Sequence, residues 1–144
     1  NILDEKNGPP PEVNLFNEKN NGETILKLID NNLIKSAHDV SLGGIITAVA
    51  KMCIKGKKGI KIKKPKYLIN EIEYLFAEDQ GRYIIEINKK DFKKVADILN
   101  KNAVHFDELG TIIENELYIN DKTKVTIDEL STSNKSWLIN YMSK

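Results

Sequence analysis

One short segment, SAHDVSLGG at residues 36–44, combines side chains that bind anions or move protons. His38 and Asp39 are adjacent, as in a pair where a carboxylate orients a histidine base, although such neighbours more often bond to local backbone groups. Three further positions favour a ligand loop: Ser41, Gly43 and Gly44. Free amides at a helix start attract phosphate or carboxylate groups, and glycine lets a ligand approach the backbone. The spacing matches neither GxxxxGK[ST] nor GxGxxG, so this segment alone indicates a ligand loop only weakly.

A second polar segment, LFAEDQGRY at residues 75–83, lies where a helix pattern gives way to a strand pattern. Its polar side chains are Glu78, Asp79, Gln80 and Arg82. The acid and amide groups can bind a metal, a hydroxylated ligand or an amide. Equally, Glu78 or Asp79 can pair with Arg82 and hold the turn. Arg82 is the one arginine among 22 basic residues, and its planar guanidinium binds carboxylate or phosphate in a way lysine cannot. The residues leave these two interpretations open.

Several classes of function are disfavoured by composition. Two histidines, one cysteine and no HxxH or CxxC spacing argue against a zinc site. The lone Cys53 excludes an internal disulfide and fits a reducing compartment, so we expect a cytoplasmic protein without a signal peptide or membrane span. The net charge of +1 favours neither nucleic acid nor an anionic membrane as partner. Eight lysines at residues 51–66 lack interleaved aromatics and predict a solvated surface.

The elements that must position the two polar segments alternate along the chain. Three consecutive prolines make residues 1–14 an extended arm or linker, and residues 15–144 are expected to form one domain. Apolar spacing predicts a helix within residues 15–34, strongest after Gly22, and then a strand through residues 34–40. A buried helix over residues 43–54 follows, with Ser41 as its N-cap and Cys53 in the core. Gly56 and Gly59 are predicted to end that helix.

The second half repeats the alternation. Strands are predicted at residues 58–64, stopped by Pro65, and at residues 82–88, with a helix at 67–76 between them that carries Leu68, Ile72, Leu75 and Phe76 at helical spacing. An amphipathic helix at 91–102 has these inward positions: Phe92, Val95, Ala96, Ile98 and Leu99. Strands at 105–113 and 116–120 are predicted to form a hairpin, followed by an extended piece at 124–130 and a helix at 133–142. The fold class is therefore α/β or α+β, a mixed sheet with flanking helices.

The motifs in this order resemble a known family. HDVSLGG before a buried helix, LFAEDQGRYIIEI about thirty residues later and ELGTI together resemble the C-terminal domain of the AIR synthase-like superfamily. GPPPEVNL, EKNNGETILKLI and SWLINYM resemble the last domain of the phosphoribosylformylglycinamidine synthase family, in the synthetase subunit of the three-component type. The resemblance covers essentially all 144 residues.

The resemblance implies a place in purine biosynthesis. Enzymes of that family convert formylglycinamide ribonucleotide, ATP and glutamine to the amidine, with magnesium, a separate glutaminase subunit and a small accessory subunit. The synthetase polypeptide holds two tandem copies of a two-domain unit, and this chain resembles the second domain of the second copy. It is then about a fifth of that polypeptide, which accounts for the missing initiator methionine. The family's catalytic histidine, magnesium carboxylates and most ATP contacts lie in other domains, so we expect no catalytic residue, metal ligand or cofactor in this domain alone.

The resemblance also bears on the candidate residues. It implies that the turn from Glu78 to Arg82 faces a non-catalytic cleft, which holds a structural nucleotide in some relatives. Leu42 stands where the family pattern HDVSDGG has an acid, and losing that charge from a helix start weakens a ligand role. We therefore expect a structural domain that is inactive alone. Two alternatives stay open: a free-standing module for a phosphorylated ligand, and a domain of another superfamily enzyme such as selenophosphate synthetase. The candidate ligand-binding or cleft-lining residues are His38, Asp39, Ser41, Gly43, Gly44, Glu78, Asp79, Gln80 and Arg82.

Overall fold

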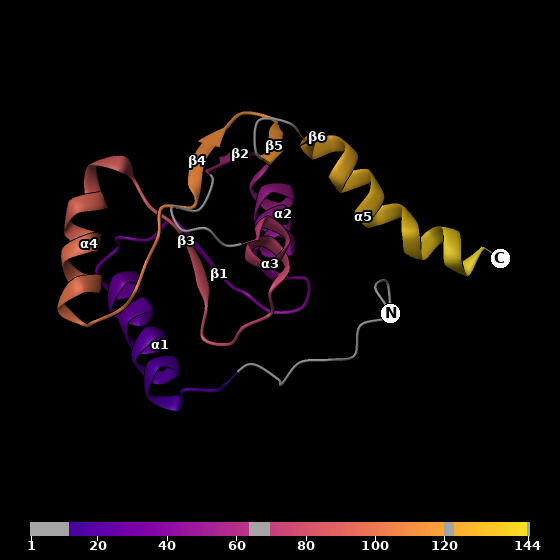
Figure 1. Ribbon diagram of the computed structural model, residues 1–144. Coiled ribbons are helices and arrows are strands. Elements are labelled where there is room, and N and C mark those ends of the chain that lie inside the picture. Colours follow the sequence, from indigo (N-terminus) through magenta and orange to yellow (C-terminus); the bar gives the residue numbers. More distant parts are fainter. Residues whose placement is uncertain (1–11, 64–69, 120–122, 144) are drawn as a thin grey trace.

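The computed structural model describes residues 12–63, 70–119 and 123–143 (Figure 1). In the first half, the elements are α1 (Leu15–Asp30), β1 (Ser36–Asp39), α2 (Gly44–Gly56), β2 (Gly59–Ile62) and α3 (Glu71–Phe76). In the second half, they are β3 (Tyr83–Glu86), a 3-10 turn η1 (Lys89–Asp91), α4 (Phe92–Lys101), β4 (Gly110–Ile113), β5 (Glu116–Ile119), β6 (Thr123–Thr126) and α5 (Ile127–Met142). No helix among these residues is long and apolar enough to cross a membrane.

The strands form two separate sheets. β1 and β3 pair antiparallel, so that Asp39 lies opposite Tyr83. The second sheet has the order β4-β2-β5-β6, with β2 antiparallel to β4 and parallel to β5, and β6 antiparallel to β5. The predicted mixed sheet with flanking helices is confirmed.

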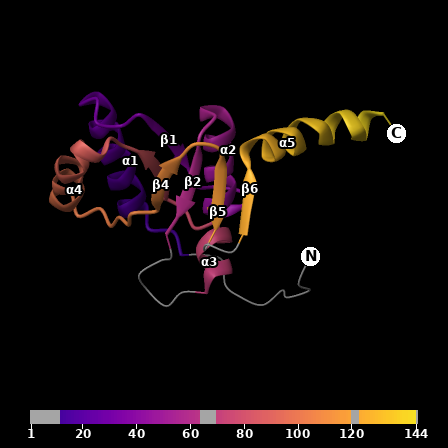
Figure 2. The ribbon, with the colours of Figure 1, turned by 90° about the horizontal axis from the view of Figure 1, so that it is seen from above.

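Each sheet has its own hydrophobic core. On one side of the molecule, α1 and α4 lie side by side next to the β1–β3 pair (Figures 1 and 2). The core there consists of Leu28 of α1, Leu33 after it, and Val95 and Leu99 of α4. On the other side, α2, α3 and the start of α5 cover the four-stranded sheet, and the residues buried there include Val49, Cys53, Leu75, Leu117 and Ile127. A fully buried side chain of this size contributes roughly 1.5–3 kcal/mol, so both cores stabilise the arrangement.

The predicted buried face of α4 was partly wrong, and the apolar spacing of α3 is only partly buried. On α4, Val95 and Leu99 are buried and Ala96 and Ile98 half-buried, but Phe92 is exposed. On α3, Leu75 is buried while Ile72 and Phe76 are exposed, and Leu68 lies outside the described residues. Phe92 is the first residue of α4 and Phe76 the last of α3. At a helix end, a side chain on the apolar side of the helix can lie beyond the edge of the core and stay exposed.

The predicted hairpin at residues 105–120 is wrong. β4 and β5 do not pair with each other, because β2 lies between them and pairs with both. The chain joining β4 to β5 crosses the start of β2 at Gly59, whose N–H donates to the Glu114 carbonyl at 3.1 Å. A Cβ at Gly59 would collide with the Glu116 backbone, so the crossing requires glycine there. Gly59 thus begins β2, and Gly56 alone ends α2, followed by Lys57 at φ 51°; Pro65 lies outside the described residues.

Two helix starts differ from their predictions. Ser41 is not the N-cap of α2; that position is Gly43, which has φ 84° and no side-chain cap. The predicted extended piece at 124–130 ends at Thr126, and α5 begins at Ile127. The reason is a capping box, in which the Thr126 and Glu129 side chains each bond the other's backbone amide. The three β-branched residues of the sequence KVTI indicated a strand, and the cap at Thr126 ends it.

Candidate functional site

The β1–β3 pair brings the two polar segments of the sequence together. Asp39 lies opposite Tyr83, and the Val40 N–H donates to the Arg82 carbonyl at 2.9 Å. The loop after β1 and the turn before β3 therefore lie at the same end of this sheet. Six of the candidate residues are in these two connections, Gly44 begins α2, and the remaining two, His38 and Asp39, end β1.

The start of α2 is capped by a carboxylate from the other segment. The Gly43 N–H donates to Glu78 Oε1 at 2.7 Å, across 35 residues of chain. The Gly44 N–H donates to the Ser41 carbonyl at 2.9 Å. An anion is expected at this position, because free amides and the helix dipole favour negative charge. Here the protein's own Glu78 supplies that charge.

The helix start also packs tightly against α3. Gly44 has φ 67°, and a Cβ at this residue would lie 2.6 Å from the Leu75 carbonyl oxygen and the Phe76 carbonyl carbon. At Gly43, a Cβ would collide with the Thr47 side chain. Gly44 is therefore required for the contact between α2 and α3, and Gly43 is required by its positive φ and the nearby Thr47 side chain. No ligand is needed to explain the two glycines.

Arg82 holds the turn before β3. Its Nη1 donates to the Ala77 carbonyl and to Asp79 Oδ2, both at 3.2 Å. Asp79 is the acid that pairs with Arg82, which is one of the two interpretations that the sequence left open. Gln80 is exposed, and Gly81 takes φ 70°. Burial raises the pKa of the nearby Tyr74 phenol, the Asp107 carboxylate raises it further, and Arg82 lowers it.

A contact from α1 to this turn had no signal in the sequence. The Asn21 side-chain amide donates to the Gly81 carbonyl at 3.0 Å, across 60 residues of chain. Asn21 is one of several asparagines in a polar helix face, so periodicity does not distinguish it. The contact ties α1 to the same end of the β1–β3 pair.

His38 contacts its own neighbour. Its Nδ1 lies 2.6 Å from the Asp39 carbonyl oxygen and 3.4 Å from Asp39 Oδ1. This arrangement is the bond to local backbone groups that such pairs usually form. Over the described ranges, no group of three or more His, Cys, Asp and Glu side chains is placed to hold a metal ion. Burial raises the pKa of the Cys53 thiol to about 11, so the thiol stays protonated at neutral pH and is a poor nucleophile.

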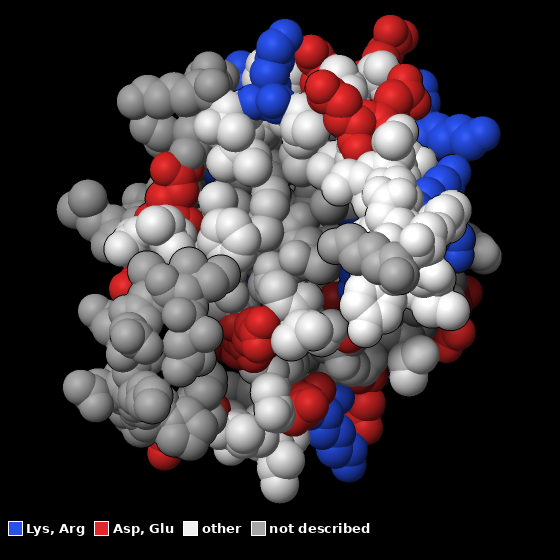
Figure 3. All heavy atoms as spheres, turned by 90° about the vertical axis from the view of Figure 1, so that its right-hand side faces the viewer, with Lys and Arg blue, Asp and Glu red and all other residues white. Residues whose placement is uncertain are grey.

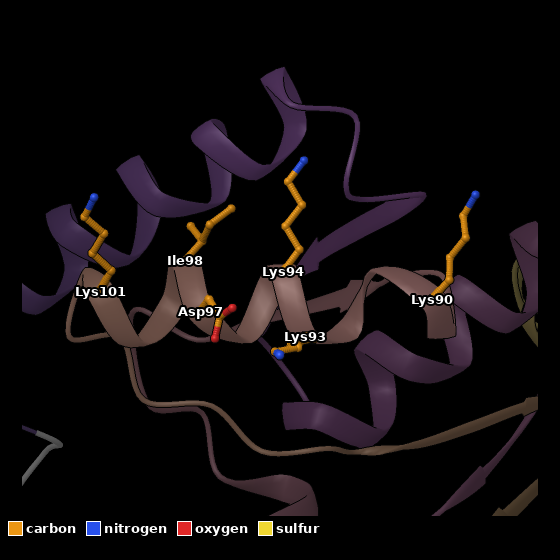
Figure 4. A pocket seen from close by; sticks show the side chains of 6 residues that line it. All are labelled: Lys90, Lys93, Lys94, Asp97, Ile98 and Lys101. Carbon is orange, nitrogen blue, oxygen red and sulfur yellow. The ribbon is translucent and has the colours of Figure 1, made fainter.

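The lysine-rich surfaces lie elsewhere. A shallow hollow along α4 is lined by Lys90, Lys93, Lys94, Asp97, Ile98 and Lys101. The lysine side chains extend separately into solvent and do not converge on one point (Figure 4). Within residues 51–63, the lysines are exposed, as predicted, and Lys63 pairs with Glu108 at 2.6 Å. Neither surface has the converging donors that define a phosphate site.

Comparisons with known proteins agree with this architecture. The family described as AIR synthase related protein, C-terminal domain, matches residues 1–122. The chain is 70% identical over 141 residues, 98% of its length, to phosphoribosylformylglycinamidine synthase subunit PurL of Pelagibacter ubique. It is 36% identical over 144 residues to the protein of the same name from Bartonella henselae. The chain spans only 19% and 20% of the length of these two relatives.

Solved structures show the same fold. Thermotoga maritima PurL complexed with FGAR matches with a TM-score of 0.73 at 22% identity, covering 90% of this chain and 23% of that chain. The structure of PurLQS from Thermotoga maritima matches with a TM-score of 0.69 at 23% identity, with the same two coverages.

Proposed function

The chain belongs to the family of AIR synthase related proteins, as a C-terminal domain, and from this premise we propose that it is the last domain of a phosphoribosylformylglycinamidine synthase polypeptide. The observation that carries the proposal is the 70% identity across 98% of the chain to a relative five times as long. In this proposal, residues 15–144 are one domain of the larger synthetase.

The activity proposed for the whole polypeptide is the ATP-dependent conversion of formylglycinamide ribonucleotide to its amidine, with glutamine as the nitrogen source. ATP and magnesium bind in other domains. A glutaminase subunit and a small accessory subunit complete the enzyme in the cytoplasm. The solved relatives include PurL complexes with ATP and with AMPPCP and a PurLQS assembly, and those names support the proposal.

The role proposed for this domain is structural. Its polar groups bond to one another: Glu78 accepts from the Gly43 amide across the two segments, and Asp79 pairs with Arg82 within the second. Gly44 is explained by its close contact with the backbone at the end of α3, where no side chain fits. We propose that these residues line the non-catalytic cleft of the synthetase and hold its wall in shape.

The activity is tested with the whole polypeptide. With ammonium chloride as nitrogen donor, we expect it to form the amidine from formylglycinamide ribonucleotide in the presence of ATP and magnesium. The 144-residue chain alone is the control and is expected to be inactive. An inactive whole polypeptide, correctly folded by circular dichroism, contradicts the proposed function.

The structural role is tested by an amide NMR titration of the 144-residue chain with ATP and magnesium, and then with formylglycinamide ribonucleotide. We expect no chemical-shift change at millimolar ligand. Saturable shifts at residues 41–45 and 78–82 contradict the structural role and favour a module that binds a phosphorylated ligand. In that case, Glu78→Gln should tighten binding, because the substitution removes a competing negative charge from the helix start.

A further inference from the structure

The two halves of α5 have opposite surroundings. Its first turns pack on the domain: Ile127 is 4% exposed, Leu130 is partly buried, and α5 contacts α2. Its last turns extend away from the body in both ribbon views (Figures 1 and 2). The exposed residues of those turns, which we call the α5 tip, are Trp137, Leu138, Ile139, Tyr141 and Met142, each 52–76% exposed.

The α5 tip is apolar around much of the helix. At 100° per residue, its five side chains cover about 200° of the circumference, whereas a helix lying on a protein surface shows an apolar stripe of roughly 100°. No Asp, Glu, Lys or Arg occurs between Ser136 and Ser143. On the face of the molecule from which α5 projects, the described surface has uncharged areas, with acidic side chains at its top and in its lower middle and basic side chains at its top, right edge and bottom (Figure 3). The apolar circumference of the α5 tip fits a partner that encloses the helix.

α5 also lies outside the part of the chain that the family model matches. The family match ends at residue 122, whereas α5 begins at Ile127. The long relatives match across 141 and 144 residues, and therefore include α5. The family match thus stops before α5, whereas the matches to the long polypeptides continue into it.

We infer that the α5 tip docks into an apolar groove formed by the rest of the synthetase polypeptide. This inference rests on the proposed function, because it requires that longer polypeptide. The six helical residues from Trp137 to Met142 span only about 9 Å, so the tip cannot supply the roughly 800 Å² per partner of a stable interface between separate proteins. A second copy or a separate subunit is therefore a poor occupant. Within one polypeptide, the covalent link supplies a high effective concentration, and a small apolar contact is sufficient.

Hydroxyl-radical footprinting of the whole synthetase polypeptide, without other subunits and at low concentration, tests the inference. Trp137, Tyr141 and Met142 react readily when exposed, and each is measured in the folded polypeptide and in the same polypeptide unfolded in urea. We expect oxidation of all three to be several-fold slower in the folded state. Equal rates overturn the inference. Protection that appears only at high concentration assigns the tip to a second copy, and protection that needs the glutaminase assigns it to a subunit; either result also overturns it.

A charge substitution gives a second, independent measurement. Leu138→Asp should lower the Tm of the whole polypeptide and leave the Tm of the 144-residue chain unchanged, since Leu138 is 52% exposed there. Leu26→Asp on α1 is the matched control, because it also places a new charge at an exposed leucine of the 144-residue chain; Leu26 is 60% exposed. An unchanged Tm in the whole polypeptide overturns the inference. Amidine formation is assayed in parallel: an unprotected tip in an active enzyme refutes only the docking, and a protected tip in an inactive one refutes only the proposed function.

Discussion

The starts of α2 and α5 show two ways of satisfying the free amides of a helix. At α5, Thr126 and Glu129 form a capping box within four residues, with the Thr126 N–H donating to Glu129 Oε2 at 2.9 Å. At α2, the N-cap is Gly43, which has no capping side chain and whose amide bonds Glu78, 35 residues away. The first cap is local, and the second exists only when α3 and the turn before β3 are in place.

The difference follows from what each start contacts. α2 must approach the backbone of α3 closely, and Gly43 and Gly44 both have positive φ, which non-glycine residues rarely adopt. A serine or threonine cap usually has extended backbone angles, so it does not suit this geometry. The start of α5 has no such restriction, and an ordinary cap is possible there. Because α2 contacts α3 closely at its first residue, its start is capped by the distant Glu78 and not by a neighbouring side chain.

The largest expected effect comes from Gly44→Ala. The new Cβ meets the backbone of Leu75 and Phe76 at 2.6 Å, in a strained backbone conformation, and should lower the free energy of unfolding by about 2–4 kcal/mol. Urea denaturation of the 144-residue chain followed by circular dichroism measures it. Gly56→Ala, at the other end of α2, is the matched control, because nothing lies within 4 Å of its Cβ. Equal midpoints for the two variants would show that the α2–α3 contact is not close.

Removing the local cap should have a smaller effect. Thr126→Ala loses the acceptor for the Glu129 amide and should lower the free energy of unfolding by about 0.5–2 kcal/mol. Faster hydrogen exchange in the first turn of α5, with α2 unchanged, should accompany it. Thr132→Ala, at an exposed interior position of the same helix, is the control and is expected to be neutral or slightly stabilising. Faster exchange in α2 as well would mean that the two caps are coupled.

Removing only the charge of the distant cap should have a smaller effect again. Glu78→Gln keeps an oxygen that accepts from the Gly43 amide but loses the interaction of a negative charge with the helix dipole, a cost of about 0.3–1 kcal/mol. The Tm difference from the unsubstituted chain should shrink at high salt, because Glu78 is exposed. Glu114→Gln, on the turn between β4 and β5, removes the same charge from another exposed glutamate. A Tm loss equal to that of this control would indicate that the Glu78 charge does not interact with the dipole of α2.

The smallest effect is expected from pH. Hydrogen bonds from the Thr126 backbone and then from its side chain hold the pKa of Glu129 below its ordinary value of 4.5. A lowered pKa in the folded state means that the stabilisation is present above that ordinary value and is lost as the pH falls through the lowered one. Hydrogen exchange in the first turn of α5, corrected for its intrinsic pH dependence, should therefore quicken in acid. Glu129→Gln should lack this acid step, and its persistence in that variant would assign the step to another group.

The predictions from sequence succeeded where one element decided the outcome. The spacing of Val95 and Leu99 predicted the buried side of α4, and the apolar run around Cys53 predicted a core helix. The box between Thr126 and Glu129 was also present in the sequence, but the β-branched residues before it favoured a longer strand. The hairpin failed because alternation identifies β4 and β5 as strands without saying that β2 lies between them.

The amino-acid sequence by itself determined the elements and the local caps of this protein, because helical spacing, strand alternation and a capping box depend on residues within a few positions of each other. Tertiary structure decided the rest. It placed β2 between β4 and β5, paired Asp39 with Tyr83, and brought Glu78 to the Gly43 amide. Those contacts join residues far apart in the chain, and they form only when burial of the two cores offsets the entropy of closing the long loops between them.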